Sequence, residues 1–171
     1  MRCQRGNRKQ MNYKELPGDT RVWIFQCDRK LSDSEIEAIK EQGDNFIDGW
    51  AAHGERLEAA FEILHGQFLI IFADEEQAEA SGCSIDRSVH FIKNLEKEYF
   101  ISLLNRTLIA YKVDDEIVTL PQEEFIELVA QGALSKDTIV FNNLVTTKQD
   151  LETKWEVPLK QSWHKDLIKK K

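Results

Sequence analysis

The sequence predicts an α+β domain with a ferredoxin-like core, on two observations. β-rich and amphipathic helical runs follow one another in the order strand, helix, strand, strand, helix, strand. The length of 171 residues suits one domain with one core. We therefore expect a split β-α-β (βαββαβ) core over about residues 21–113, with two helices on one face of an antiparallel sheet. A C-terminal helix and strand extension, residues 114–168, is expected to pack on this core.

The N-terminal part predicts a basic disordered segment followed by the first strand. Residues 1–10 are polar and basic without periodicity, and Met11 is the expected natural start. Turn chemistry follows at Pro17-Gly18-Asp19, so we place the disordered segment at residues 1–18 and the single domain at residues 19–171. Residues 21–27 are rich in aromatic and β-branched side chains and predict a strand.

The first helix has a detailed start signal. Ser32 is the expected N-cap, and Glu35 completes a capping box with it. Leu31 and Ile36 have the spacing of a hydrophobic staple. Apolar residues then recur at helical spacing, so the helix is expected from residue 33 to about residue 53.

A hairpin, a second helix and a last strand complete the predicted core. Two apolar runs, residues 58–64 and 67–73, flank His65-Gly66, a pair typical of a tight connection. The second helix is expected from about Ser84 to Tyr99. Residues 105–112 are then expected to return as a strand of the same sheet.

The extension has weaker signals. A turn is expected at residues 114–116, and Pro121 is typical of a first helical position, so a third helix is expected to about Gln131. Residues 138–145 are a further candidate strand. The large aromatic residues beyond it, Trp155 and Trp163 among them, predict that the segment packs on the core.

Composition argues against several classes of function. The net charge is −7, and the first twenty residues hold five basic and two acidic side chains, so the rest of the chain is more acidic still. Such a body repels nucleic acid, which is bound by clustered basic faces. No apolar run approaches the roughly 18 residues of a membrane span, and the basic N-terminus has no apolar segment of a secretory signal behind it. We expect a cytoplasmic protein that does not insert into membranes.

The cysteines are expected to be free thiols. Cys3, Cys27 and Cys83 are an odd number, and no export signal accompanies them. No C-x-x-C pair suggests a redox dithiol or a zinc site, and the histidines have no recognised ligand spacing. We expect no metal and no cofactor.

Four segments carry a resemblance to a known family. They are residues 50–54 (WAAHG), 80–86 (ASGCSID), 141–145 (FNNLV) and 155–164 (WEVPLKQSWH). The chain from Met11 onward resembles a family of small bacterial proteins, of the Bacteroidetes type, that are commonly labelled "ABC transporter ATPase". That label implies ATP hydrolysis, which needs a P-loop to hold phosphates and Mg²⁺. Neither G-x-x-x-x-G-K-[ST] nor LSGGQ occurs in the sequence, so the resemblance predicts a family without supporting the ATPase label.

The turn that opens the second helix is the predicted site. Gly82 relaxes the backbone there and leaves Cys83 near the helix's free N–H groups. The positive potential of a helix N-terminus favours a thiolate and attracts ligand anions, so Ser81, Gly82, Ser84 and Asp86 are expected ligand-binding residues. In the alternative interpretation, Ser81 or Ser84 only caps the helix and Cys83 is a packed residue.

A partner for Cys83 is expected on the first helix. His90 follows Asp86 by four residues on one face, but seven residues of helix span roughly 10.5 Å, too far for His90 to reach the thiol. The ferredoxin-like plan starts the second helix where the first one ends, which places His53 beside Cys83 as its activating base. Alternatively, His53 caps the last carbonyls of its own helix.

Three further residues are weighed as ligand contacts. Trp50 precedes His53 on the first helix and is included in the expected site. His164 lies beside Trp163, and the sequence leaves open whether this segment folds over the same end of the domain. Asn143, with its neighbour Asn142, suits a polar ligand or a turn.

Three functions remain in competition at this point. The first is a domain that binds a small molecule or an anion at the Ser81 to Asp86 turn. The second is a thiol-dependent enzyme with Cys83 as nucleophile and His53 as base. The third is a module that recognises a protein partner through exposed sheet or through Trp155 and Trp163. The predicted fold is compatible with all three, and the sequence specifies neither the ligand nor the oligomeric state.

Overall fold

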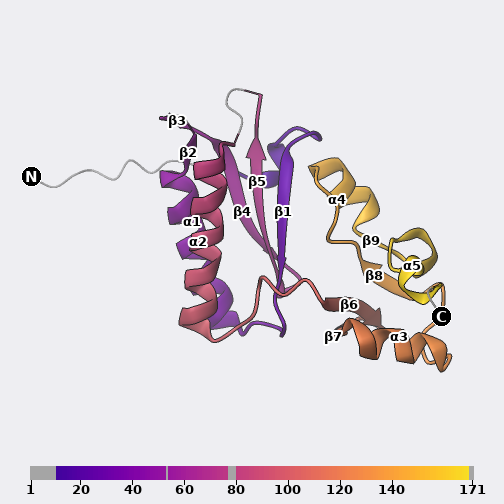
Figure 1. The fold of residues 1–171 in the computed structure, drawn as a ribbon. Helices are drawn as coiled ribbons and strands as arrows, with labels where there is room; N and C mark the ends of the chain where they lie inside the picture. Colours follow the sequence, from indigo (N-terminus) through magenta and orange to yellow (C-terminus); the bar gives the residue numbers. More distant parts are fainter. Residues whose placement is uncertain (1–10, 53, 77–79, 170–171) are drawn as a thin grey trace, which may run out of the picture.

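The computed structural model describes residues 11–52, 54–76 and 80–169, and its elements form two sheets with helices packed around them (Figure 1). The strands are β1 (Arg21–Gln26), β2 (Ala51–Ala52), β3 (Glu55–Arg56), β4 (Glu58–Leu64), β5 (Phe68–Asp74), β6 (Leu108–Val113), β7 (Glu116–Pro121), β8 (Ile139–Phe141) and β9 (Glu156–Pro158). The helices are α1 (Asp33–Gly49), α2 (Gly82–Tyr99), α3 (Gln122–Ala130), α4 (Lys148–Lys154) and α5 (Lys165–Ile168), with 3-10 turns η1 (Tyr13–Glu15) and η2 (Leu159–Gln161). The predicted α+β class is confirmed.

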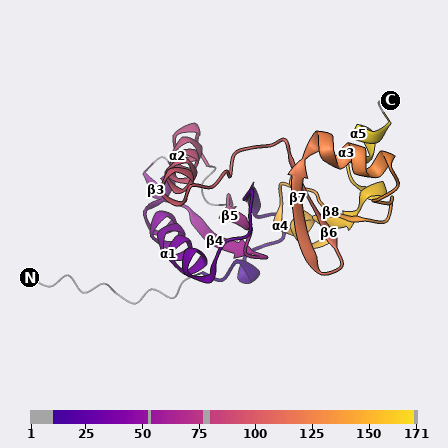
Figure 2. The same cartoon turned by 90° about the horizontal axis from the view of Figure 1, so that it is seen from below.

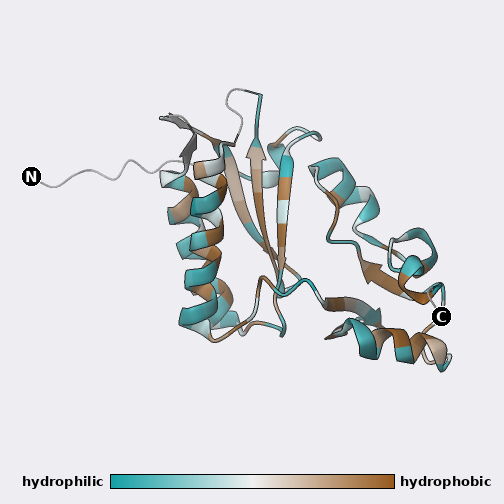
Figure 3. Cartoon of the chain, in the orientation of Figure 1, coloured by the Kyte–Doolittle hydropathy of each residue, from teal (hydrophilic) through white to brown (hydrophobic). Residues whose placement is uncertain are grey.

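The first sheet is antiparallel in the order β1-β5-β4 and is covered on both faces. Its central strand β5 is buried almost throughout. Leu69 and Ile71 pack against α1 and α2, whereas Phe68, Ile70 and Phe72 pack against the C-terminal part. Figures 1 and 2 show α1 and α2 on one side of this sheet and α4, β8 and β9 on the other. In Figure 3 hydrophobic colours run through β5 and β8, whereas α1 and α2 carry hydrophilic teal along much of their length.

Local signals formed as predicted. The Ser32 hydroxyl accepts a hydrogen bond from the Glu35 backbone, and the Glu35 carboxylate accepts one from the Ser32 backbone, so the capping box is confirmed. The β4–β5 hairpin turns through His65 and Gly66, both with positive φ. Helix α1 ends four residues before the expected boundary, because Trp50 adopts an extended backbone and buries its ring.

The predicted ferredoxin-like sheet is not confirmed, because its fourth strand lies elsewhere. The strand expected near residues 105–112 is β6, which belongs to a second sheet of order β7-β6-β8-β9 and not to the edge beside β1. The reason is local: a tight turn at Asp114 gives β6 an immediate hairpin partner in β7. Ile109 and Tyr111 of β6 are buried in a separate core with Phe125 of α3.

The C-terminal extension packs on the core, as its aromatic residues predict. Phe141 and Trp155 are buried against Phe68 of β5, with ring centroids 4.6 and 4.9 Å away from the Phe68 ring. Helix α3 begins after Pro121, as expected, and the expected strand at 138–145 is the shorter β8. Strands β7 and β9 and helix α4 were not predicted.

The expected disordered segment is partly ordered. Tyr13 stacks on Phe72 with ring centroids 4.8 Å apart, and Leu16 is buried in the same core. The buried Lys148 ammonium donates to the carbonyls of Lys14 and Leu16, at 3.2 and 2.9 Å. These contacts order residues 11–18, whereas residues 1–10 lie outside the described residues. Within the described ranges, no helix is long and apolar enough to cross a membrane.

Candidate functional site

The predicted turn functions as a helix cap. The Ser81 hydroxyl accepts from the Ser84 backbone at 3.2 Å, and the buried Ser84 hydroxyl donates to the Ser81 carbonyl at 2.8 Å. Gly82 begins α2 without a positive φ. Cys83, on the first turn of the helix, and Asp86, just after that turn, are both exposed. Both serine hydroxyls are therefore engaged in capping, while the thiol faces solvent.

Trp50 joins the end of α1 to the start of α2. Its buried indole donates to the Ser84 carbonyl at 2.7 Å, and the Arg87 guanidinium donates to the Gly49 carbonyl at 3.2 Å. The two helix ends therefore meet, as the predicted topology requires. Trp50 fills the core there and ties the two helices together. His53 lies outside the described residues, so its pairing with Cys83 stays a prediction.

His164 lies in a different place from the turn. Figures 1 and 2 place α5, which begins at the next residue, across the first sheet from α2. The His164 ring is buried, stacks on Trp163 with centroids 4.0 Å apart, and shares a 2.7 Å hydrogen bond between Nδ1 and the Ser162 hydroxyl. Burial lowers the pKa of His164 to about 4, so its ring is neutral at pH 7.

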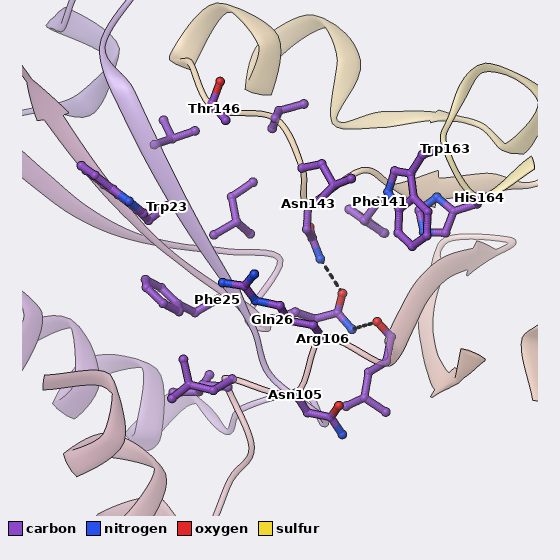
Figure 4. A pocket seen from close by; sticks show the side chains of 17 residues that line it. Trp23, Phe25, Gln26, Asn105, Arg106, Phe141, Asn143, Thr146, Trp163 and His164 are labelled. Atoms are coloured by element: carbon purple, nitrogen blue, oxygen red, sulfur yellow. Dashed lines mark hydrogen bonds between the residues drawn. The ribbon is translucent and has the colours of Figure 1, made fainter. Parts of the chain in front are cut away.

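His164 and Trp163 close one end of a cleft between the two sheets. The cleft has a volume of about 300 Å³. Its first wall is β1, which contributes residues 22–26, and its second is the linker that joins α2 to β6. The segment after β8, residues 143–146, completes it. Figure 4 shows Trp163 and His164 on the opposite side of this space from Trp23 and Phe25.

The linker wall is held in place by two carboxylates. Glu96 accepts from the backbone N–H groups of Leu103 and Leu104, at 2.7 and 3.0 Å. Asp28 accepts from the backbone N–H of Ser102 at 3.1 Å. Because these bonds fix the linker to both α2 and the end of β1, this side of the cleft is formed before any ligand arrives.

A polar network joins the other walls. The Asn143 amide donates to the Gln26 side-chain carbonyl at 2.7 Å, and Asn143 accepts from the Trp155 indole at 2.9 Å. The Gln26 amide in turn donates to the Leu108 carbonyl at 3.4 Å. Because these side-chain amides are already hydrogen-bonded within the protein, they shape the cleft, and other groups must bind the ligand.

Arg106 is the charged group of the cleft. Among the described residues, no aspartate or glutamate lines this space, and Arg106 is the one charged residue that does. Arg21 and Arg29 pair with carboxylates, and Arg87 donates to a backbone carbonyl. Arg106 is exposed and makes no hydrogen bond or ion pair with any residue that the structure describes, so its guanidinium is open to solvent beside the cleft. Figure 4 shows its side chain extending toward β1.

A second unpaired donor belongs to Trp163. Its indole N–H is buried and makes no hydrogen bond within the described part of the chain. A buried polar group without a partner costs roughly 1–3 kcal/mol, so such donors are uncommon in native structures. Among the described residues the buried Thr20 hydroxyl is also without a partner. The cleft therefore combines aromatic and aliphatic walls, which include Trp163, with the exposed cation of Arg106.

The sequence signals for this cleft were weak. Its polar residues come from four distant parts of the chain, and Gln26 and Arg106 belong to no motif. Asn143 was weighed as a ligand contact and serves as a bridge, while Asn142 forms a turn by accepting from the Leu144 backbone at 3.3 Å. The sequence indicated His164 as a candidate ligand contact but did not indicate where its segment packs. That His164 lines the same cleft as Arg106 depends on how the two sheets pack.

Comparison with family models, curated proteins and solved structures found no match to this chain. The resemblance to the bacterial family therefore stays a prediction. No group of three or more His, Cys, Asp or Glu side chains among the described residues is arranged to hold a metal ion. Function must be inferred from the cleft's own geometry and chemistry.

Proposed function

We propose that this protein is a binding domain for a small organic anion, a carboxylate with an apolar body, held in the cleft between the two sheets. The observation that carries the proposal is Arg106, an exposed arginine without an acceptor among the described residues. It lies beside a cleft that no described acidic residue lines, in a protein of net charge −7. The expected class of function, anion or small-molecule binding, is retained. Its expected location moves from the Ser81 turn to the cleft.

The walls favour an apolar ligand body. Val22, Ile24 and Phe141 present hydrocarbon surface to the cleft, and Trp23 and Phe25 add aromatic rings. Ligand pockets are commonly apolar cavities of about 300–1,000 Å³ with a few polar groups that fix orientation. The volume of about 300 Å³ lies at the lower end of that range, which suits a small ligand.

The polar groups favour a carboxylate. A guanidinium binds a carboxylate through paired N–H groups, and charge-assisted hydrogen bonds of this kind are stronger than neutral ones. His164 is neutral at pH 7, so it adds no charge to the cleft. A cationic ligand would meet Arg106 without a compensating acid.

The test is calorimetric titration of the full chain with phenylacetate, hexanoate and N-acetyl-leucine, each compared with its uncharged amide. We expect acids to bind and amides to bind about tenfold more weakly or not at all. Arg106→Gln should weaken acid binding about tenfold or more. Lys93→Gln removes the same charge from another exposed position, on α2 and outside the cleft lining, and should change nothing.

Two results would contradict the proposal. One is that none of the acids binds to the wild-type chain. The other is that acid and amide bind alike, or that Arg106→Gln and Lys93→Gln have the same effect, because general electrostatic attraction would then account for binding.

A second candidate function is thiol chemistry at Cys83, favoured by the exposed position of this thiol at the start of α2 and by the contact between Trp50 and Ser84. If His53 activates Cys83, the rate of iodoacetamide alkylation at Cys83 should fall in His53→Ala and show a different pH profile. The buried Cys27, whose pKa burial raises to about 11, is an internal unreactive control. Equal profiles for the wild type and His53→Ala would contradict the dyad.

A further inference from the structure

Strand β1 has an open edge inside the cleft. In an antiparallel pair, alternate residues direct their backbone N–H and C=O groups toward the partner strand and away from it. The Val22 N–H points away from β5, because it donates to the Thr146 carbonyl at 2.9 Å. By the same alternation, the backbone groups of Ile24 and Gln26 also point away from β5 and toward the cleft.

These outward groups have no partner among the described residues. Thr146 takes the Val22 N–H, but neither Ile24 nor Gln26 makes an outward backbone hydrogen bond within the described chain. Exposed edges are usually protected by charged side chains, proline or bulges. Residues 22–26, VWIFQ, contain no charge and no proline. The edge is instead shielded by the walls of the cleft, which leaves it available to a narrow ligand.

This edge is where the ferredoxin-like plan would place its last strand. Strand β6 pairs with β7 and β8 instead, so beyond the bridge between Arg21 and Thr147 no described strand pairs with this edge of β1. Ile24 and Gln26 are two residues apart, about 7 Å along the strand. An extended chain of a few residues would satisfy both. Arg106 lies at the Gln26 end, because Gln26 donates to the carbonyl of Leu108 in the same segment.

We propose that the cleft binds the extended carboxyl-terminal end of a peptide, which adds as a strand to the edge of β1 and places its free carboxylate against Arg106. This inference rests on the proposed function and specifies its ligand. Backbone groups of the peptide pair with Ile24 and Gln26, and alternate side chains face the apolar walls. The uncharged walls favour apolar side chains.

Other occupants fit less well. The chain's own basic segments, residues 1–10 and 169–171, would bring positive charge to Arg106. A second copy pairing β1 with β1 would have to bring a whole sheet edge between the linker and residues 143–146, which line the cleft on its other sides. A single extended chain avoids both problems.

The first experiment uses a pool of N-acetylated tetrapeptides with free carboxyl ends, and the same pool with amidated ends. Each is incubated with the full chain, and retained peptides are identified by ultrafiltration and mass spectrometry. We expect enrichment of apolar sequences from the acid pool only, and its loss with Arg106→Gln but not with Lys93→Gln. No enrichment from the acid pool would overturn the inference.

The second experiment methylates the backbone nitrogens of the best peptide one at a time. Strand addition predicts an alternating pattern, in which methylation at one position weakens binding about tenfold and methylation at the next has little effect. Ile24→Pro removes one outward N–H without removing a bond to β5, and it should weaken peptide binding while Ile24→Val does not. The methylation series uses the wild-type chain, so it tests strand addition even if Ile24→Pro fails to fold.

The outcomes separate the two proposals. Arg106-dependent binding of phenylacetate or hexanoate, with no alternation in the methylated peptides, would keep the proposed function and overturn strand addition. Failure of all acids and all peptides would overturn both. A dimer in sedimentation that Ile24→Pro abolishes would assign the edge to a second copy and overturn the inference.

Discussion

The side chains of Asn143 and Gln26, 117 residues apart in sequence, are joined by a hydrogen bond of 2.7 Å. This bond ties the segment after β8 to the last residue of β1 and so holds two walls of the cleft together. Asn143 also accepts from the Trp155 indole, which places it at the centre of the contact between the two sheets.

Asn143→Ala should destabilise the protein by about 1–3 kcal/mol, because it leaves the Trp155 N–H and the Gln26 carbonyl without their partner. The measurement is the free energy of unfolding in urea. A double-mutant cycle with Gln26→Ala should show coupling of about 0.5 kcal/mol or more. Additive effects would mean that the bond does not link the walls energetically.

Gly43→Ala should destabilise the protein by about 1–3 kcal/mol, as overpacking of a core does. A Cβ at Gly43 would lie 2.0 Å from Cδ1 of Phe61, so α1 could not keep its distance from β4. Gly49→Ala, in the same helix, meets nothing within 4 Å and should be neutral or stabilising by up to about 1 kcal/mol. Thermal unfolding of both variants checks this, and equal effects would contradict the close approach at Gly43.

Glu35 should make stability depend on acid pH. Its carboxylate accepts two hydrogen bonds from Arg29, at 2.9 and 2.8 Å, and these lower the pKa of Glu35 to about 2 from its ordinary 4.5. The folded state thus releases the proton more readily than the unfolded state. The stabilisation is complete above about pH 4.5 and is lost as the pH falls toward 2. The stability difference between wild type and Glu35→Gln, measured in urea, should shrink across this window. A constant difference would contradict the assignment.

His164 should also lower stability in acid, over a different window. Burial lowers the pKa of its imidazole to about 4 from 6.5, so the unfolded state takes up a proton first as the pH falls. Stability associated with His164 is therefore complete above about pH 6.5 and declines toward pH 4. In His164→Gln this decline should be absent. Proton NMR titration of the ring gives a direct check, and a midpoint near 6.5 would contradict the buried, neutral ring.

Features set by neighbouring residues were predictable. The capping box of Ser32 and Glu35 depends on four consecutive residues, and the turn at His65-Gly66 joins two strands that are adjacent in sequence. The two helix ends meet near Trp50, as the order of the first strands and helices along the chain predicted. For these features the partner of each group lies close along the chain.

Which edge β6 would join was not predictable in this way. Its residues suit either the open edge of β1 or a hairpin with β7, and the short turn at Asp114 decides between them at a small entropic cost. That outcome opens the position beside β1 and creates the cleft. Arg106 and Asn143 became candidate site residues only through this arrangement.

The sequence by itself therefore determined helices α1, α2 and α3, the β4–β5 hairpin and the class of the fold, because hydrophobic period and capping chemistry act over a few residues. Only the tertiary structure decided that Gln26, Arg106, Asn143 and His164 line one cleft, since the segments that carry them are far apart in the sequence and belong to both sheets. Such an arrangement depends on which surfaces stay exposed after the elements have packed, and local sequence patterns do not encode this.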